Sequence, residues 1–431
     1  MYFNEEIEKI SLKFKNKKAL IDINSNKSLS YGELFNDILS IKEFLLSRGL
    51  KSGDEVASVL DNSIENLEYF LSCCYLGLVY LPQSNEITEY ELKKLFEDTN
   101  IKTFLISDTT NLKIKKILLN SKVKIININQ QLKKNKNKKI KKKLPILIVN
   151  SSGTTGDPKK IMIDVNRLWQ SAKNFAKNYQ FLSSKNTFYN FLPMSYLGGL
   201  FNLGIIPLSI GSTVIIDKQF SGNTFLTFWN KVKQYNIDIL WLVPTILRGL
   251  ITMSEKVKMN YKNYKVLPKA CFLGTANCSL KEKKKFEKIF KIPIFENYGT
   301  SETTFISLES KLTKKNKTQN IGKIISCLKY KIKNKTLHIK SPFNFLGYYN
   351  KKIKNNFKNV NSSFYDTGDI CEITKNNFLI FKGRKREIIK KGGLLISLKE
   401  VNEIFQINHS VVESYALPIR HEFYGEDYLI F

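Results

Sequence analysis

The sequence predicts an α/β fold: a large N-terminal body of parallel-rich sheets flanked by helices, which includes a small β subdomain, and a small, truncated α+β C-terminal lobe. Segments of strand and helix character alternate over residues 28–82, and such alternation is typical of parallel sheets flanked by helices. Residues 330–382 instead contain short β-like segments separated by Asn and Gly turns. At Gly383 the pattern changes again, to a basic turn, a double glycine and a helix near 398–406. We therefore expect a body over residues 1–382 and a lobe over residues 383–431.

The first helix of the alternating region is expected to begin after Ser30. Ser30 and Glu33 form a capping-box pattern, apolar residues then recur at helical spacing, and Gly49 ends the helix. Three further elements complete the alternation: a strand, a helix and a short buried strand, over residues 55–60, 63–76 and 79–81.

One apolar segment, Leu197–Ile216, has the length of a membrane span and contains no charged residue. It includes four glycines, Asn202 and Pro207, and it has neither basic flanks nor an aromatic belt. We interpret it as a buried helix followed by a buried strand, and we expect no transmembrane segment. The N-terminus also lacks the apolar region of a signal peptide.

The composition is that of a globular protein with an excess of lysine. The chain has 431 residues, 42% apolar and 25% charged, with a net charge of +31. That length corresponds to about two to four domains. Nucleic-acid binding is one interpretation of the charge. However, only six of the 69 basic residues are arginine, the residue that nucleic-acid readers favour, so we expect no specific nucleic-acid partner.

Two further features concern surface and location. The basic run over 131–143 is expected to be a solvated loop, because like charges repel one another; contact with an acidic partner or a membrane surface is the alternative. The six cysteines contain no CxxC pair and only three histidines are present, which argues against a zinc site and a disulfide framework. Reduced thiols and a cytoplasmic location are expected.

The strongest functional signal is the segment 147–160, in which the apolar strand LIVN leads into the loop SSGTTGDPKK. Glycine lets backbone N–H groups approach a phosphate closely, hydroxyl groups donate further hydrogen bonds, and lysine supplies positive charge. The spacing differs from that of the P-loop. A Ser/Thr/Gly linker is the alternative, but a linker rarely follows a buried strand, so the segment favours phosphate binding.

This loop resembles the signature loop of the adenylate-forming superfamily, which includes acyl-CoA synthetases, luciferases and the adenylation domains of peptide synthetases. Lys160 stands where the signature usually has Gly. Further motifs of the superfamily follow in the same order: FLPMSYLGG at 191–199, LGTAN at 273–277, NYGTSE at 297–302, PFNFLGY at 342–348, YDTGD at 365–369 and GRKREIIK at 383–390. The resemblance extends from Tyr31 to Phe431.

The resemblance implies an AMP-forming acid–thiol ligase. Such an enzyme joins a small carboxylic acid to the α-phosphate of ATP and passes the acyl group to CoA or to the thiol of an acyl carrier protein. ATP and Mg²⁺ are therefore the expected cofactors, with CoA as a co-substrate. The implied ATP-binding residues are Ser151, Ser152, Gly153, Thr154, Thr155, Gly156, Lys159, Gly274, Thr275, Ala276, Asn297, Tyr298, Gly299, Ser301, Asp369 and Arg384.

Individual roles follow from the resemblance and from side-chain chemistry. Lys159, Ser301 and Glu302 are the expected catalytic residues, with Glu302 as the Mg²⁺ ligand and Ser301 as a donor to the α-phosphate. Tyr298 offers an aromatic face to adenine. The Asp369 carboxylate can accept hydrogen bonds from both ribose hydroxyls, and Arg384 contacts ribose or phosphate. Taken singly, Tyr298 is typical of a core residue, Asp369 of a turn and Glu302 of the surface.

The acyl pocket and the hinge are also implied by the resemblance. Lining the pocket and ordinary packing remain alternatives for the expected pocket residues, which are Tyr196, Trp241, Val243 and Gly274. Arg386 occupies the hinge position. The sequence stops at Phe431, before the family's later lysine segment; we expect a truncated C-terminal lobe and slow adenylation by the chain alone. A degenerate, non-catalytic nucleotide-binding relative is the alternative.

Overall fold

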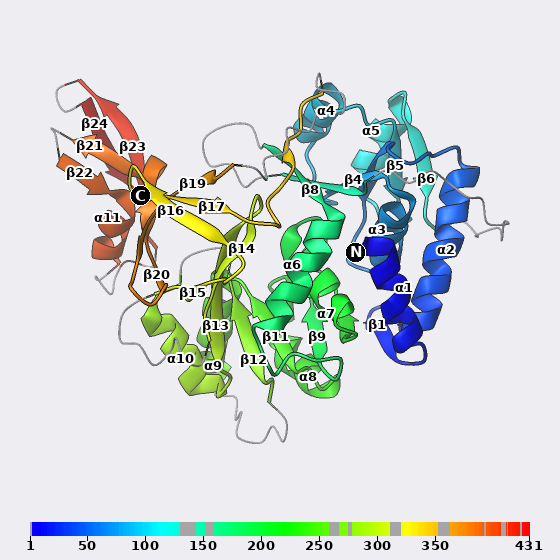
Figure 1. Ribbon diagram of the computed structural model, residues 1–431, viewed down its shortest axis with the longest axis horizontal. Coiled ribbons are helices and arrows are strands. Elements are labelled where there is room, and N and C mark those ends of the chain that lie inside the picture. Colours follow the sequence, from blue (N-terminus) through cyan, green and yellow to red (C-terminus); the bar gives the residue numbers. More distant parts are fainter. Residues whose placement is uncertain are drawn as a thin grey trace. The chain divides into compact units, whose positions relative to one another are not determined.

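The computed structural model divides the chain into two compact units, which are described separately below (Figure 1). The first comprises Met1–Phe305 and Pro342–Val360, and the second comprises Ile306–Ser341 and Asn361–Phe431. The division falls inside strand β14 (Thr304–Leu308). The structure describes residues 2–129, 144–150, 159–257, 267–274, 278–310, 320–351, 363–391, 394–406, 411, 413–422 and 425–431.

The first unit contains a seven-stranded sheet with the strand order β18-β8-β7-β4-β3-β5-β6. Its central strands are parallel, whereas β8 pairs antiparallel with both β7 and β18. The predicted parallel-rich α/β fold is therefore confirmed. The strands are β3 (Glu55–Val59), β4 (Val79–Gln83), β5 (Thr103–Ile106), β6 (Lys124–Asn127), β7 (Ile146–Asn150), β8 (Lys160–Asp164) and β18 (Gly347–Tyr348).

Two helices of the first unit form where the apolar spacing predicted them. Helix α2 (Tyr31–Ser47) has the predicted capping box, in which the backbone N–H of Glu33 donates to Ser30 and the Glu33 carboxylate accepts from the Ser30 N–H. Helix α3 (Ile64–Leu76) begins after Ser63 and ends at Gly77, whose φ of 79° is the left-handed conformation that glycine adopts at helix ends. Helices α4 (Glu89–Asp98) and α5 (Leu112–Asn120) pack their apolar residues into one cluster with strands of the sheet.

A second sheet of the first unit follows the order β14-β13-β12-β11-β9-β10-β1-β2. Strands β13, β12, β11, β9, β10 and β1 run parallel, and β2 pairs antiparallel with β1 at the edge. The strands are β1 (Lys18–Asp22), β2 (Lys27–Ser30), β9 (Thr187–Asn190), β10 (Thr213–Ile216), β11 (Ile239–Leu242), β12 (Ala270–Leu273) and β13 (Ile294–Thr300).

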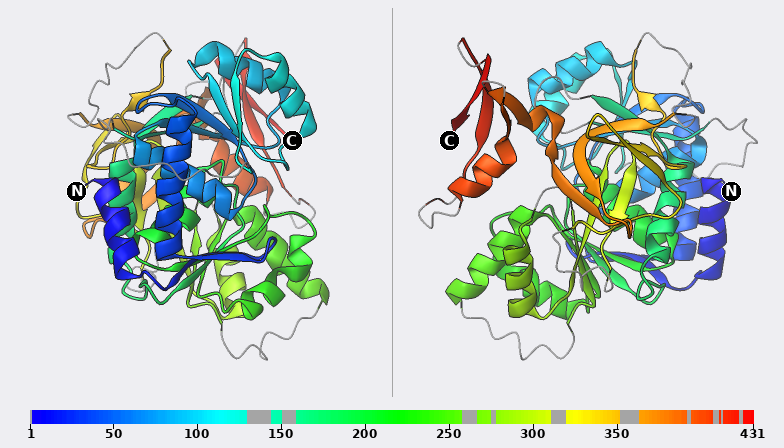
Figure 2. Two further views of the ribbon diagram at one scale, coloured as in Figure 1. Left: turned by 90° about the vertical axis from the view of Figure 1, so that its right-hand side faces the viewer. Right: turned by 60° about the vertical axis from the view of Figure 1, so that its left-hand side comes forward.

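Aromatic side chains from distant parts of the sequence form the core beside this sheet. The Phe175 ring lies 5.2 Å from Trp241, 5.0 Å from Phe272 and 4.5 Å from Phe305. Phe175 belongs to α6, so this cluster fixes the helix against three strands. The other helices are α1 (Phe3–Lys13), which lies beside α2 (Figure 2), α6 (Val165–Lys177), α8 (Thr224–Gln234), α9 (Pro244–Val257) and α10 (Leu280–Phe290).

The apolar segment 197–216 forms a buried helical stretch followed by strand β10, as predicted. The first part is a π-helix, η1 (Gly198–Ile205), and it continues into α7 (Ile206–Ser209). None of the described helices combines the length and apolar character needed to cross a membrane.

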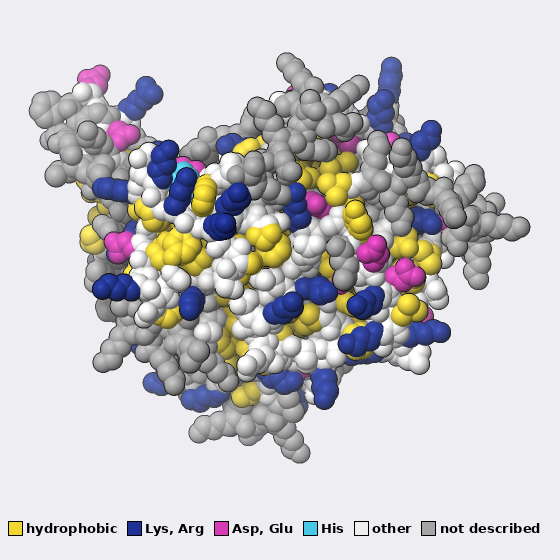
Figure 3. Space-filling model, in the orientation of Figure 1, with side chains coloured by type: hydrophobic (Ala, Val, Ile, Leu, Met, Phe, Trp, Pro, Cys, Tyr) yellow, Lys and Arg dark blue, Asp and Glu magenta, His cyan; other side chains and the backbone are white. Residues whose placement is uncertain are grey.

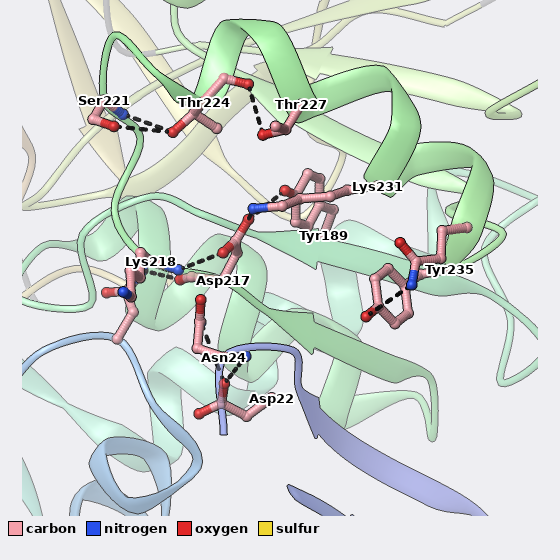
Figure 4. A network of polar contacts seen from close by, with 12 residues as sticks. Asp22, Asn24, Tyr189, Asp217, Lys218, Ser221, Thr224, Thr227, Lys231 and Tyr235 are labelled. Atoms are coloured by element: carbon pink, nitrogen blue, oxygen red, sulfur yellow. Dashed lines mark hydrogen bonds and ion pairs between the residues drawn. The ribbon is translucent and has the colours of Figure 1, made fainter. Parts of the chain in front are cut away.

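A buried charge network joins β9, β10 and α8 (Figure 4). The Asp217 carboxylate, whose side chain is 2% exposed, accepts from the Tyr189 hydroxyl at 2.6 Å and lies 2.6 Å from the Lys231 ammonium. It also accepts the backbone N–H of Lys218 at 2.8 Å. Burial, and then the negative charge of Asp217, raise the pKa of Tyr189. The network compensates a carboxylate that would be costly to bury alone.

The second unit contains the predicted antiparallel β region, a four-stranded sheet with the order β16-β17-β19-β20. A second antiparallel sheet has the order β22-β21-β24-β23, and helix α11 packs on it through Leu398 and Val401. The elements are β15 (Lys323–Ile324), β16 (Lys329–Lys333), β17 (Thr336–Lys340), β19 (Tyr365–Ile373), β20 (Leu379–Arg384), η5 (Lys385–Glu387), β21 (Ile388–Lys391), β22 (Leu394–Ser397), α11 (Leu398–Phe405), β23 (Ala416–His421) and β24 (Gly425–Ile430).

Candidate active site

Three predicted site residues come directly after residues that are paired across neighbouring parallel strands of the first unit. In the register of β11, β12 and β13, Leu242 lies opposite Leu273, and Leu273 lies opposite Glu296. The residues that directly follow Leu242, Leu273 and Glu296 in the sequence are Val243, Gly274 and Asn297, respectively. These positions lie toward the carboxyl ends of the strands, where open α/β sheets bind their ligands.

Gly274 and Asn297 fit together closely. The Asn297 side-chain amide donates to the backbone carbonyl of Leu273 at 3.0 Å. A Cβ atom at position 274 would lie 2.7 Å from Asn297 Oδ1, a distance at which one of the groups must move. Glycine at 274 therefore allows the buried Asn297 side chain to occupy the end of the neighbouring strand.

A tight turn between β13 and β14 carries Ser301 and Glu302. A Cβ at Gly299 would lie 1.6 Å from the carbonyl oxygen of Thr304, so only glycine permits this approach of the backbone. The backbone N–H of Thr300 donates to the Thr303 hydroxyl at 3.2 Å, and the N–H of Thr303 donates to the Thr300 carbonyl at 3.2 Å. These bonds fix the turn, while Ser301 and Glu302 remain partly exposed.

Glu302 and Lys159 meet at the side chain of Tyr348. The Tyr348 hydroxyl donates to Glu302 Oε1 at 3.0 Å, and the Lys159 ammonium lies 5.0 Å from the centre of the Tyr348 ring. The backbone N–H of Phe345 also donates to the Glu302 carbonyl at 2.7 Å. The structure thus brings together two predicted catalytic residues through a third residue to which the sequence analysis assigned no role.

The adjacent lysine has a different partner. The Lys160 ammonium lies 2.7 Å from Asp98 Oδ2 in α4, and the Lys160 side chain is 11% exposed. Lys159 itself is exposed. Of the two lysines at the end of the loop, Lys160 ties β8 to a helix and Lys159 contacts the site.

The expected acyl-pocket residues do not share one environment. Tyr196 is 53% exposed, whereas Trp241 is fully buried in the aromatic core around Phe175. Val243 is partly buried at the end of β11. Their assignment to an acyl pocket stays a prediction.

Some predicted residues lie outside the described part of the chain, and for Arg386 only the backbone is described. The backbone of Arg386 belongs to η5, and its hinge role stays a prediction, as does the boundary at residues 382 and 383. The predicted residues outside the described ranges are Ser151, Ser152, Gly153, Thr154, Thr155, Gly156, Thr275 and Ala276.

In the second unit, the predicted ribose residue and the predicted basic residue form an ion pair. Asp369 and Arg384 lie opposite each other in the register of β19 and β20, with Arg384 Nε 3.1 Å from Asp369 Oδ1. The Asp369 side chain is 1% exposed and that of Arg384 is 40% exposed. Within β19, Gly368 has a φ of 70° and the Asp369 N–H donates to the Thr367 hydroxyl at 3.1 Å, at a point where the pairing of β19 with β17 is irregular.

The family model for AMP-binding enzymes matches residues 7–349, which is most of the chain. The chain belongs to the AMP-binding enzyme family. It is 25% identical to oxalate–CoA ligase of Arabidopsis thaliana, over 98% of this chain and 86% of that protein. It is also 25% identical to 2-succinylbenzoate–CoA ligase of Staphylococcus epidermidis strain ATCC 12228, over 95% of this chain and 84% of that protein.

Solved structures share the fold of this AMP-binding family member. ATP-bound MatB from Rhodopseudomonas palustris superimposes with a TM-score of 0.84 at 19% identity, covering 100% of this chain and 88% of that chain. The o-succinylbenzoate CoA synthetase MenE from Bacillus subtilis, in complex with its acyl-adenylate intermediate, gives a TM-score of 0.82 at 19% identity, covering 99% of this chain and 87% of that chain. The predicted superfamily resemblance is confirmed.

The donor set around Glu302 fits a magnesium ion that is held jointly with a substrate. Within the described residues, no three His, Cys, Asp or Glu side chains are grouped so that they could hold a metal. Mg²⁺ is usually bound by one or two carboxylates together with substrate phosphates. A single carboxylate at Glu302, with the Lys159 cation on the ring of the shared neighbour Tyr348, suits that arrangement and does not suit an all-protein metal cage.

The lysine and arginine side chains of the described residues are scattered over the face drawn in Figure 3. In Figure 3, lysine and arginine side chains are spread between uncharged areas and do not form one continuous patch. Five of the six cysteines are buried, and Cys327 is exposed.

Proposed function

We propose that this chain is an AMP-forming acid–CoA ligase. The observation that carries the proposal is the meeting of Lys159 and Glu302 at Tyr348 in a chain that the AMP-binding family model matches over residues 7–349. This arrangement supports phosphate charge neutralisation by Lys159 and metal binding by Glu302. The curated relatives reported above are CoA ligases, which favours CoA over a carrier-protein thiol as the acceptor.

The proposed reaction has two steps. In the first, a carboxylate oxygen of the acid attacks the α-phosphorus of ATP, the bond to pyrophosphate breaks, and an acyl-adenylate forms. In the second, the CoA thiolate attacks the acyl carbon and AMP leaves with the bonding electrons. Bound Mg²⁺ would offset negative charge on the phosphates during the first step. Lys159 would hold the phosphates, Ser301 would donate to the α-phosphate, and Asp369 would accept from the ribose hydroxyls.

The test is ATP–pyrophosphate exchange with a panel of carboxylic acids. Oxalate and 2-succinylbenzoate belong in the panel because relatives are named for them, together with short-chain, long-chain and aromatic acids. Acids that support exchange are then assayed for AMP release with CoA and, separately, with a phosphopantetheine-loaded carrier protein. We expect exchange with at least one acid and acyl transfer to CoA. ATP binding without exchange for any acid would instead favour a non-catalytic nucleotide-binding relative.

A further inference from the structure

We propose that Tyr348 is a positioning residue. Its hydroxyl orients the Glu302 carboxylate toward Mg²⁺, and its ring holds the Lys159 ammonium on the same side chain. This inference rests on the proposed function, because it concerns the metal-dependent binding of ATP. Its basis is that one side chain contacts both charged groups through two different chemistries. The hydroxyl donates to Glu302 Oε1 at 3.0 Å, and the ring face lies 5.0 Å from the Lys159 ammonium.

The backbone around Tyr348 is held firmly enough to position a neighbour. Strand β18 pairs with β8, so that Gly347 lies opposite Met162 and Tyr348 opposite Ile161. On either side of this pair, the N–H of Leu346 donates to the Met162 carbonyl and the N–H of Tyr349 donates to the Lys160 carbonyl, both at 2.7 Å. Strand β8 begins at Lys160, directly after Lys159, so the pairing also sets the distance between Tyr348 and Lys159.

The Tyr348 ring and the Glu302 turn are held from the same segment. The rings of Phe345 and Tyr348 are 5.1 Å apart in an edge-to-face arrangement, a geometry that favours one orientation of each ring. The N–H of Phe345 donates to the Glu302 carbonyl at 2.7 Å. Phe345 therefore holds the Glu302 backbone, and Tyr348 holds the Glu302 carboxylate. Glu302 and Tyr348 are 46 residues apart in the sequence.

The contact with Tyr348 leaves Glu302 able to bind a metal. An ionised carboxylate has two oxygens with about four acceptor positions, so a hydroxyl on Oε1 leaves Oε2 available. Metal-binding carboxylates are commonly oriented by such hydrogen bonds, and loss of one outer partner typically lowers metal affinity about 10- to 100-fold. The ring contributes separately, because the negative face of an aromatic ring attracts an ammonium group.

The experiment compares ATP binding in the presence of EDTA and of Mg²⁺ by isothermal titration calorimetry. Tyr348→Phe removes the hydroxyl and keeps the ring. We expect this variant to bind ATP in EDTA with the affinity of the wild type, within about twofold. We expect the Mg²⁺ concentration that gives half-maximal enhancement of ATP binding to rise about 10- to 100-fold.

The adjacent Tyr349 supplies a matched control. Its hydroxyl also contacts a glutamate, Glu55, at 2.8 Å, so Tyr349→Phe removes the same group from the same strand region. This variant should keep the wild-type Mg²⁺ dependence. Tyr348→Leu also removes the ring. Unlike Tyr348→Phe, it should lose ATP affinity a few-fold in EDTA, because Lys159 loses its aromatic contact.

Each other outcome overturns the inference in a recognisable way. Wild-type Mg²⁺ dependence in Tyr348→Phe would show that the hydroxyl does not orient Glu302. Equal losses in EDTA and in Mg²⁺ would indicate a general structural role, and so would equal losses in Tyr348→Phe and Tyr349→Phe. A wild-type chain that binds ATP without any Mg²⁺ enhancement would refute this inference alone, whereas no ATP binding under either condition would also refute the proposed function.

Discussion

The Asp369 carboxylate lies 3.1 Å from the Nε atom of Arg384, its partner across strands β19 and β20. Asp369 is buried and Arg384 is partly exposed, so the pair gives a buried carboxylate a cation that reaches solvent. The predicted ribose residue is therefore oriented by the predicted basic residue before any nucleotide is present. This pairing was not evident from the two motifs, which were assigned separate contacts.

Asp369→Ala is expected to weaken ATP binding by about 1.5–3 kcal/mol, the range for hydrogen bonds to a charged group. Calorimetric titration with ATP measures the change. The control is Glu372→Gln, which removes an exposed carboxylate from the same strand, 3.2 Å from Lys382, and should leave ATP affinity unchanged. An unaltered ATP affinity in Asp369→Ala would refute the ribose assignment.

Lys231→Met should destabilise the first unit by roughly 3 kcal/mol, because Asp217 would remain buried without its cation. Denaturant unfolding followed by tryptophan fluorescence gives the free energy of unfolding. Lys93→Met is the matched control, since Lys93 and Glu89 form a pair whose side chains are 64% and 61% exposed. That variant should change stability by no more than about 0.5 kcal/mol. Equal effects of the two variants would contradict the network's role.

A cavity of about 620 Å³ in the first unit contains two facing carboxyl groups, Asp37 and Glu68, with Glu65 and Lys27 at its wall. Burial, and then the charge of Asp37, raise the pKa of Glu68 from its ordinary value of 4.5 to about 8. At a pH between 4.5 and about 8, the Glu68 carboxyl keeps its proton in the native state and loses it in the unfolded state. The contribution of this group to stability is therefore present at low pH and is lost as the pH rises through about 8.

Glu68→Gln should remove this pH dependence. We expect the wild type to lose about 1–3 kcal/mol from this group between pH 5 and pH 8, and the variant to show a correspondingly flatter profile of the free energy of unfolding. Glu89→Gln is the control, because Glu89 pairs with Lys93 at 2.7 Å in an exposed ion pair whose loss leaves Glu68 unchanged, and it should keep the wild-type slope. Identical profiles for the wild type and Glu68→Gln would show that Glu68 titrates normally in the native state.

Gly299→Ala should destabilise the turn that carries Glu302, because the added methyl group would meet the Thr304 carbonyl oxygen. Overpacking of this kind costs about 1–3 kcal/mol. Gly222→Ala is the matched control, since a Cβ there has nothing within 4 Å. Thermal unfolding compares the two, and equal melting temperatures would mean that the turn relaxes without cost.

The expected hinge can be tested by limited proteolysis. Trypsin should cut the native chain within residues 385–391, where Lys385 is exposed, and should release a stable fragment ending there. The basic run at 131–143, which lies outside the described residues, is a second expected site. A chain resistant at both places would contradict the predicted boundary at residues 382 and 383.

The local elements of the fold were predictable from neighbouring residues. Ser30 and Glu33 marked the start of α2, and Gly77 marked the end of α3, because caps depend on residues within one turn of the helix end. The π-helical form of η1 was not predictable. Apart from Asn202 the segment contains only apolar residues and glycine, so its sequence has no polar–apolar periodicity that would indicate a helix type.

The contacts within the site depended on distant residues and could not be derived from spacing. The motifs identified Lys159 and Glu302, but the fold alone placed Tyr348 between them. The buried position of Trp241 was not predictable from the sequence for the same reason. Its burial comes from Phe175, Phe272 and Phe305, three residues on three other elements, and no local pattern records that convergence.

The ion pair between Lys160 and Asp98 also distinguishes two neighbouring lysines that are chemically identical. Successive residues of a strand point to opposite faces, so a slip of β8 by one residue along β7 would exchange Lys159 and Lys160. In the observed register Asn150 lies opposite Lys160, and the Lys160 ammonium lies 2.7 Å from the Asp98 carboxylate of α4. A one-residue slip would break this ion pair, so the charge pattern at the start of β8 favours the observed strand alignment over one that composition alone would tolerate.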